Sequence, residues 1–98
     1  MAKKFGGQTA VITGAGGLLC SEVSVRLAKE GARAVLIGRT EEKLRRTEQR
    51  ILKEGGECLV RTADVTDEEA MEKIAEEVKR IYGPCRYLIN GAGGNNNG

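Results

Sequence analysis

The chain has 98 residues, enough for one domain with a modest core and too few for a usual two-domain enzyme. Its 16 basic and 14 acidic residues are interspersed and its three aromatic residues are scattered, which argues against a nucleic-acid-binding surface. Three cysteines without a C-x-x-C pair, no histidine and no long apolar segment argue against a zinc site, a disulfide framework and a membrane span. We therefore expect a soluble, cytoplasmic protein that binds neither metal, nor membrane, nor nucleic acid.

The first predicted elements are a strand and a helix. Residues 9–13 (TAVIT) form a β-branched run that ends at glycine, as expected of a strand buried on both faces. The helix that follows is expected to end at Gly31. It carries an apolar row and a neighbouring row of small side chains that would let it lie close to a sheet: Leu19, Val23 and Leu27, and Cys20, Ser24 and Ala28, respectively.

A second strand is predicted over residues 33–37, followed by a second helix. Thr40 is placed to cap this helix, and two glutamates suit its positive N-terminal end. Gly55 and Gly56 would close it. The glutamates are also spaced for i, i+4 ion pairs on a solvated face: Glu41 with Arg45, and Glu42 with Arg46.

The remaining elements are a third strand, a third helix and a fourth strand. Residues 57–63 (ECLVRTA) are predicted as the third strand. Residues 66–69 (TDEE) have the form of a capping box that opens a helix at Thr66. The core stripe of this helix is Ile74, Val78 and Ile81, and Gly83-Pro84 ends it. Residues 86–90 (RYLIN) form the fourth strand, which leads into a glycine-rich tail.

This alternation predicts a parallel sheet with right-handed crossovers and helices on its faces. We expect a partial Rossmann-type, doubly wound α/β fold with strand order 3-2-1-4. The whole chain, residues 1–98, would be the N-terminal part of a single domain of this kind. Ligands bind such sheets beyond the carboxyl ends of the strands, here residues 14–19, 38–40, 64–65 and 90–94.

The first of these segments reads TGAGGLLC over residues 13–20. Gly14, Gly16 and Gly17 lie between a predicted strand and the start of a predicted helix, where backbone N–H groups and the helix dipole attract a pyrophosphate. The alternative is a tight turn that needs glycine only for its backbone conformation.

With these motifs the chain resembles the short-chain dehydrogenase/reductase family over its whole length. The family's T-G-x-x-x-G-x-G begins at Thr13-Gly14, but Leu18 and Cys20 stand in place of the second and third glycines. The family's acidic-apolar pair after the third strand matches Asp64-Val65. Its N-N-A-G appears as NGAG over residues 90–93. The altered loop and the NGAGGN ending are similar to a subgroup that includes sugar-acid (mannonate/fructuronate-type) oxidoreductases.

The departures from the pattern have physical interpretations. The third glycine permits close packing of helix on sheet, and Cys20 is small enough to approximate that role. Because Leu18 could obstruct the phosphates, we expect its side chain to turn away while Gly16 and Gly17 make the close approach. Cys58 and Cys85 lie in or beside strands and are expected to be buried small hydrophobes rather than nucleophiles.

The end of the second strand indicates the cofactor. An acidic residue there normally holds the ribose 2′-OH of NAD, whereas a nearby arginine accommodates the 2′-phosphate of NADP. Gly38 occupies the acidic position and Arg39 follows, which favours NADP(H) over NAD(H) unless Arg39 is merely a solvated side chain.

The resemblance also implies a set of cofactor contacts. Asp64 and Val65 would contact the adenine, although Asp64 could instead serve as a cap or turn residue before Thr66, a role compatible with the first. Residues 90–92 would line the ribose side. The candidate cofactor-binding residues are Gly14, Gly16, Gly17, Leu19, Arg39, Thr40, Asp64, Val65, Asn90, Gly91 and Ala92.

The family's catalytic serine and its Y-x-x-x-K pair are not found in this chain. Tyr82 is followed four residues later by Arg86, and Tyr87 by Gly91. The resemblance therefore implies the cofactor-binding half of a homo-oligomeric oxidoreductase that acts on a small carbonyl or alcohol, with these 98 residues inactive alone. The alternative is a free-standing, non-catalytic nucleotide-binding or interaction module.

Overall fold

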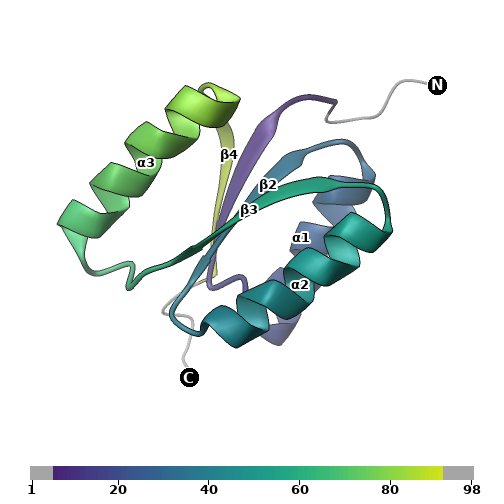
Figure 1. Cartoon of the computed structure of the whole chain (residues 1–98), viewed down its shortest axis with the longest axis horizontal. Helices are drawn as coiled ribbons and strands as arrows, with labels where there is room; N and C mark the ends of the chain where they lie inside the picture. The colour runs from purple at the N-terminus through teal and green to yellow at the C-terminus, as the bar shows by residue number, and fades with distance from the viewer. Residues whose placement is uncertain (1–5, 92–98) are drawn as a thin grey trace.

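The computed structural model describes residues 6–91 and shows a four-stranded parallel sheet with helices on both faces (Figure 1). The strands lie in the order β3-β2-β1-β4, and each neighbouring pair is parallel, which confirms the predicted fold class and order. The elements are β1 (Thr9–Thr13), α1 (Leu18–Lys29), β2 (Arg33–Gly38), α2 (Glu41–Lys53), β3 (Glu57–Thr62), α3 (Glu68–Tyr82) and β4 (Cys85–Asn90).

The sheet separates two layers of core. Helices α1 and α2 cover one face and α3 covers the other (Figure 1). Because successive side chains of a strand point to opposite faces, Ala34 and Leu36 of β2 pack on the α1/α2 side while Val35 and Ile37 pack on the α3 side. All four side chains are fully buried, so the apolar run of β2 reflects burial on both faces.

The buried faces of two helices differ from the predicted stripes. Helix α1 buries Ser21, Ser24, Val25 and Ala28, whereas the Leu19 side chain is 76% exposed. Small side chains face inward because their hydroxyls are satisfied locally: Ser21 donates to the Leu18 carbonyl and Ser24 to the Cys20 carbonyl. In α3, Val78 is buried as predicted, but Ile81 is half exposed. Ile74 packs with Val78, as the predicted stripe required, and Met71 and Tyr82 join them in place of Ile81.

The N-terminal caps of α2 and α3 differ from those predicted. Thr40 occupies the N-cap position of α2 but makes no side-chain capping bond. Helix α3 is capped by Asp67, which accepts from the Ala70 N–H at 3.1 Å, rather than by Thr66. Thr66 bonds Asp64 instead. The i, i+4 ion pairs of α2 are present as predicted: Glu41 with Arg45 at 3.2 Å and Glu42 with Arg46 at 3.7 Å.

Strand β4 is an exposed edge of the described sheet. Cys85 begins it and is exposed, contrary to the prediction that it is buried, and its thiol donates to the Tyr87 carbonyl. Leu88 of the same strand is 67% exposed. The predicted bounds of this strand are thus correct within one residue and its edge position follows from the predicted strand order, whereas the predicted burial of Cys85 was wrong.

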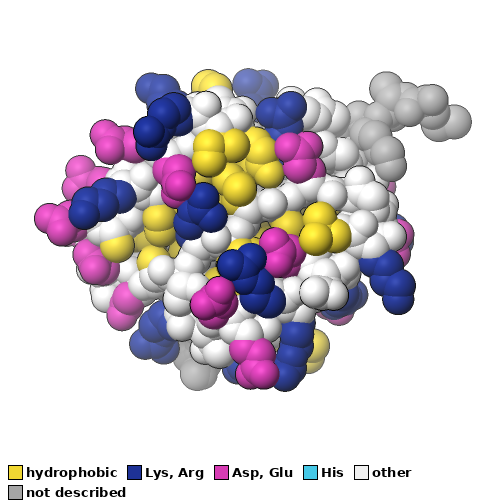
Figure 2. Space-filling model, in the orientation of Figure 1, with side chains coloured by type: hydrophobic (Ala, Val, Ile, Leu, Met, Phe, Trp, Pro, Cys, Tyr) yellow, Lys and Arg dark blue, Asp and Glu magenta, His cyan; other side chains and the backbone are white. Residues whose placement is uncertain are grey.

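Charge is distributed rather than gathered on the visible surface. In Figure 2 basic and acidic side chains alternate over the face shown, with hydrophobic side chains between them. None of the helices within residues 6–91 combines the length and apolar character that crossing a bilayer requires.

Candidate dinucleotide-binding site

The point where the strand order reverses lies between β1 and β4, whose last residues, Thr13 and Asn90, are register partners. The Thr13 hydroxyl donates to the side-chain oxygen of Asn90 at 2.8 Å. The Gly91 N–H donates to the Thr13 carbonyl at 3.1 Å. These bonds hold the carboxyl ends of the two strands together at the place where doubly wound sheets bind their ligands.

The loop from β1 to α1 is shaped by its own backbone. Gly14 has a φ of 68°, a left-handed conformation that favours glycine. The Gly17 N–H donates to the Gly14 carbonyl, and the Ala15 N–H donates to the Ile37 carbonyl of β2. The loop is thus a tight turn anchored to the neighbouring strand.

Helix α1 begins without the acidic groups found at the other helices. Its N-cap residue, Gly17, makes no side-chain capping bond, and the first turn holds no acidic residue. Helices α2 and α3 each have two glutamates in their first turn. The positive end of the α1 dipole is therefore not balanced by carboxylates of its own first turn, as suits an anion-binding helix terminus.

The structure shows where the Leu18 side chain lies and why position 16 has no room for a side chain. The Leu18 side chain is 84% exposed rather than folded over the loop. A Cβ at Gly16 would lie 2.9 Å from the Cβ of Lys43 on α2. Glycine at position 16 is therefore needed for packing against α2, whatever approaches the loop from outside.

A pocket of about 330 Å³ lies beside this loop, at the carboxyl ends of β2 and β3. It brings together four of the predicted residues, Gly14, Arg39, Asp64 and Val65, from three separate segments. The other lining residues are Gly38, Ala63 and Thr66.

Gly38, which stands at the position of the ribose-binding acid, lines the pocket but has little room for a side chain. Gly38 is buried, and a Cβ there would lie 3.1 Å from the Cδ2 of Leu44. A side chain at position 38 would therefore require the fully buried Leu44 to shift by a few tenths of an ångström. Arg39, the next residue, is exposed and lines the pocket.

Asp64 forms a local turn with Thr66. Its Oδ1 accepts from the Thr66 hydroxyl at 2.7 Å and from the Thr66 N–H at 2.9 Å. These hydrogen bonds lower the pKa of the Asp64 carboxyl, and the positive charge of Arg39 adds to the effect. Asp64 is thus ionised at neutral pH, and the turn role left open by the sequence coexists with its place in the pocket.

The other candidate residues within residues 6–91 are not among those that line this pocket. Thr40 is exposed at the start of α2, and Leu19 is exposed at the start of α1. Asn90 and Gly91 lie against Thr13, as described above, and Ala92 lies outside the described residues. Thr66 was not among the predicted site residues. It could have been found from the sequence, because a threonine two residues after an aspartate at the end of a strand is typical of a turn in which the aspartate side chain accepts hydrogen bonds from that threonine.

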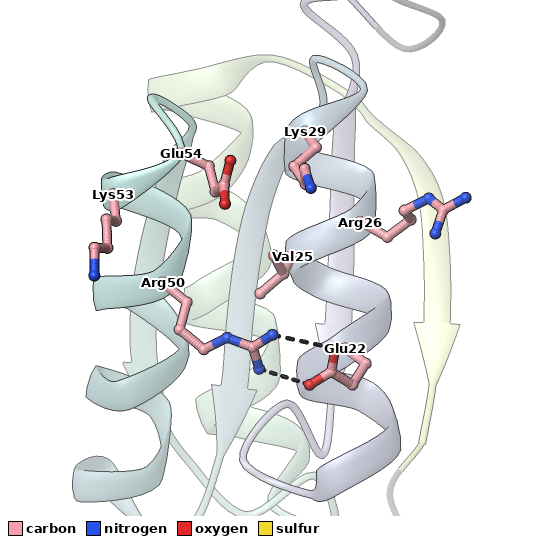
Figure 3. A pocket seen from close by; sticks show the side chains of 7 residues that line it. All are labelled: Glu22, Val25, Arg26, Lys29, Arg50, Lys53 and Glu54. Carbon is pink, nitrogen blue, oxygen red and sulfur yellow. Dashed lines mark hydrogen bonds and ion pairs between the residues drawn. The ribbon is translucent and has the colours of Figure 1, made fainter.

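A second concavity, of about 440 Å³, lies between α1 and α2 (Figure 3). The Arg50 side chain reaches across it and forms two hydrogen bonds with the Glu22 carboxylate, at 2.7 and 3.1 Å. Its lining comes from the two helices and Glu54, with no residue from the strand ends. This ion pair joins the helices, and the groove is separate from the candidate site.

The uncapped helix, the glycine turn and the adjoining pocket together fit a dinucleotide. Anionic phosphates suit the α1 terminus, and a neutral ring with a ribose suits the mostly apolar pocket that Arg39 and Asp64 help to line. The residues present therefore match the group that the fold implies.

Comparison with known proteins identifies the family. Residues 8–98 match the family described as short chain dehydrogenase. The chain belongs to this family. It is 39% identical over 93 residues to a Bacillus subtilis (strain 168) protein named "Uncharacterized oxidoreductase UxuB", a match that covers 95% of this chain and 34% of the relative.

Solved structures of the short chain dehydrogenase type agree in fold. A protein from Haemophilus influenza, named "putative D-Mannonate oxidoreductase" and solved with bound NAD, superposes with a TM-score of 0.89 at 32% identity, covering 97% of this chain and 34% of that one. A metagenomic short-chain oxidoreductase in complex with NADP gives a TM-score of 0.82 at 36% identity, with 86% and 38% covered. The chain thus spans about a third of the length of the relatives it matches.

Proposed function

We propose that this chain is the N-terminal part of a single dinucleotide-binding domain in an NAD(P)-dependent oxidoreductase that acts on the carbonyl or alcohol of a small molecule. The observation that carries the proposal is the meeting of Gly14, Arg39 and Asp64 around one pocket beside the uncapped end of α1. In a short chain dehydrogenase this is the edge of the sheet where a ligand binds.

Each segment has a distinct role in the proposed site. The N–H groups at the start of α1 would bind the pyrophosphate, and the pocket between β2 and β3 would hold the adenosine. Asn90 and Gly91, at the switch point, would line the nicotinamide ribose. When bound, the nicotinamide supplies or accepts the hydride.

We further propose that the protein prefers NADP(H). The two related structures were solved with different cofactors, one with NAD and one with NADP, so family membership does not decide the preference. Arg39 is the cation at the pocket, and guanidinium groups bind phosphate with paired hydrogen bonds. The Asp64 carboxylate nearby would repel a 2′-phosphate, but its two bonds to Thr66 hold it in its own turn.

The preference is tested by titrating the protein at its natural length with NADP⁺ and NAD⁺. The unmutated protein should bind NADP⁺ more tightly, and Arg39→Asp should reverse the order, with a change of about tenfold or more in the ratio of dissociation constants. Arg26→Asp makes the same charge change on α1, away from the pocket, and should leave the ratio unaltered. Tighter binding of NAD⁺ by the unmutated protein would refute the assignment.

For the substrate we propose a sugar acid. The altered G-G-x-L-C loop and the similarity to the protein named D-mannonate oxidoreductase support this class. A panel of keto-sugar acids and uncharged ketones, assayed by oxidation of NADPH and NADH, tests it. Faster reduction of the uncharged ketones would contradict the proposal.

The 98 residues alone are expected to be inactive and to self-associate. Strand β4 is an edge in the described sheet, with Leu88 well exposed, and such edges favour pairing with another chain. Light scattering and an NADPH assay of residues 1–98 test both parts, and a monomer with turnover would contradict them.

If the natural-length protein binds the dinucleotide without turning over any substrate, the non-catalytic module becomes the better interpretation. A homo-oligomer of the natural-length protein is also proposed, and light scattering of that protein tests it.

A further inference from the structure

Gly91 is required by space rather than by backbone conformation. Its φ is not among the left-handed values found for five other described glycines, so its backbone would accept a side chain. A Cβ at this position would, however, overlap the Sγ of Cys20. It would also lie 3.1 Å from the Thr13 carbonyl oxygen and 3.5 Å from the Cβ of Cys20.

Cys20 belongs to the first turn of α1, and Gly91 follows β4, so 70 residues of sequence separate two groups in direct contact. Cys20 is partly buried and packs against the core together with Ile89 of β4. Its sulfur therefore fills the gap between the start of α1 and the end of β4. The Gly91–Thr13 and Thr13–Asn90 hydrogen bonds hold the other side of the same segment.

We propose that Cys20 and Gly91 are a matched pair that positions the Asn90–Gly91 segment at the cofactor site. Cys20 acts as a positioning residue: its sulfur occupies the volume that a side chain at position 91 would take. The inference rests on the proposed function, because it assigns the positioned segment to dinucleotide binding.

The pair also accounts for two departures of the sequence from the family pattern. T-G-x-x-x-G-x-G has glycine where this chain has Cys20, and N-N-A-G has asparagine where it has Gly91. Relative to the pattern, this chain has a larger residue at position 20 and a smaller one at position 91. The two differences then compensate each other, because the Cys20 side chain occupies the space that a side chain at position 91 would need.

The pairing makes specific predictions for substitutions. Gly91→Ala would force its methyl group into the sulfur and move the segment, weakening NADP⁺ binding by about tenfold or more. Cys20→Ala removes only the sulfur and should weaken binding by about threefold at most. In the double variant the two Cβ atoms would lie at 3.5 Å, an ordinary contact, so binding should recover to within about threefold of the Cys20→Ala value. The close Thr13 oxygen remains and limits the recovery.

Calorimetric titration of the natural-length protein with NADP⁺, at a temperature well below the unfolding midpoint of each variant, tests the pair. Cys58→Ala is the matched control, since Cys58 is also partly buried against the same core but lies on β3. Cys58→Ala/Gly91→Ala should stay as weak as Gly91→Ala. A general loss of stability would lower the unfolding midpoint without changing the dissociation constant of the folded protein, whereas displacement of the segment changes that constant.

Recovery by Cys20→Ala and not by Cys58→Ala supports the pair. A Cys20→Ala/Gly91→Ala variant as weak as Gly91→Ala overturns it, as does equal recovery by the control. Should Gly91→Ala fail to fold, soluble yield replaces affinity as the measurement: rescue by Cys20→Ala alone supports the pair, and no rescue overturns it. Absence of NADP⁺ and NAD⁺ binding by the unmutated protein would instead overturn the proposed function, and this inference with it.

Discussion

Leu44 connects the core of the protein to the candidate site, and its truncation should affect both. Its side chain is fully buried on α2. Its Cδ2 lies 3.1 Å from the position of a Cβ at Gly38 and 3.9 Å from that at Gly16, so it fills the space beneath the turns after β1 and β2. Buried Leu→Ala changes cost about 2–5 kcal/mol. Because Leu44 lies in the first turn of its helix, where neighbouring loops can partly close a cavity, we expect Leu44→Ala to lower the free energy of unfolding by about 3 kcal/mol.

Reversible urea unfolding of the natural-length protein measures this loss as a lower midpoint at an unchanged denaturant slope. Leu52→Ala is the matched control, because the same substitution on the same helix removes a side chain that is 56% exposed. It should cost less than about 1 kcal/mol. The loss of support beneath Gly16 and Gly38 should also weaken NADP⁺ binding in Leu44→Ala alone. Equal destabilisation by the two variants would refute the reasoning.

Two further predictions concern capping and titration. Asp67→Ala removes an N-cap bond to Ala70 and should cost about 1 kcal/mol by thermal unfolding, whereas Thr40→Ala, which breaks no capping bond, should cost a few tenths; equal costs would contradict the capping assignment. Burial raises the pKa of the Cys58 thiol to about 11 from its ordinary 9.0. Below about pH 9 the thiol is neutral in both the folded and the unfolded protein, and the folded state has its full stability; as pH rises from about 9 through about 11 the unfolded protein loses the proton more readily, so the free energy of unfolding falls. Unfolding midpoints between pH 8 and about 11.5 should fall less steeply in Cys58→Ala than in the unmutated protein, and parallel pH profiles would refute this.

The elements and their order could be predicted because the relevant signals are local. The β-branched run at residues 9–13 and the glycines after α1, α2 and α3 indicated where strands and helices begin and end, and alternation then required a parallel sheet. Asp67 was missed as a cap because Thr66 satisfies the same motif one residue earlier. The choice depends on Asp64, which competes for the Thr66 hydroxyl.

Contacts between distant segments could not be predicted. In α1 the predicted row of small side chains is confirmed, since Ser24 and Ala28 are buried. The apolar row also suggested that Leu19 is buried, but Leu19 is exposed, and only the packed structure decides which of two neighbouring rows turns inward. The same holds for Gly16 against Lys43 and for Gly91 against Cys20. In each case the sequence showed a glycine, while the reason for it lies on another element.

The central claim is that the dinucleotide lies at the turns after β1, β2 and β3. Amide hydrogen exchange of the natural-length protein, with and without saturating NADP⁺, tests it most directly. We expect slower exchange over residues 13–20, 38–40 and 63–66. We expect no change over residues 50–54, a segment from which Arg50, Lys53 and Glu54 line the groove between α1 and α2. Protection of residues 50–54 without protection of residues 13–20 would contradict the account.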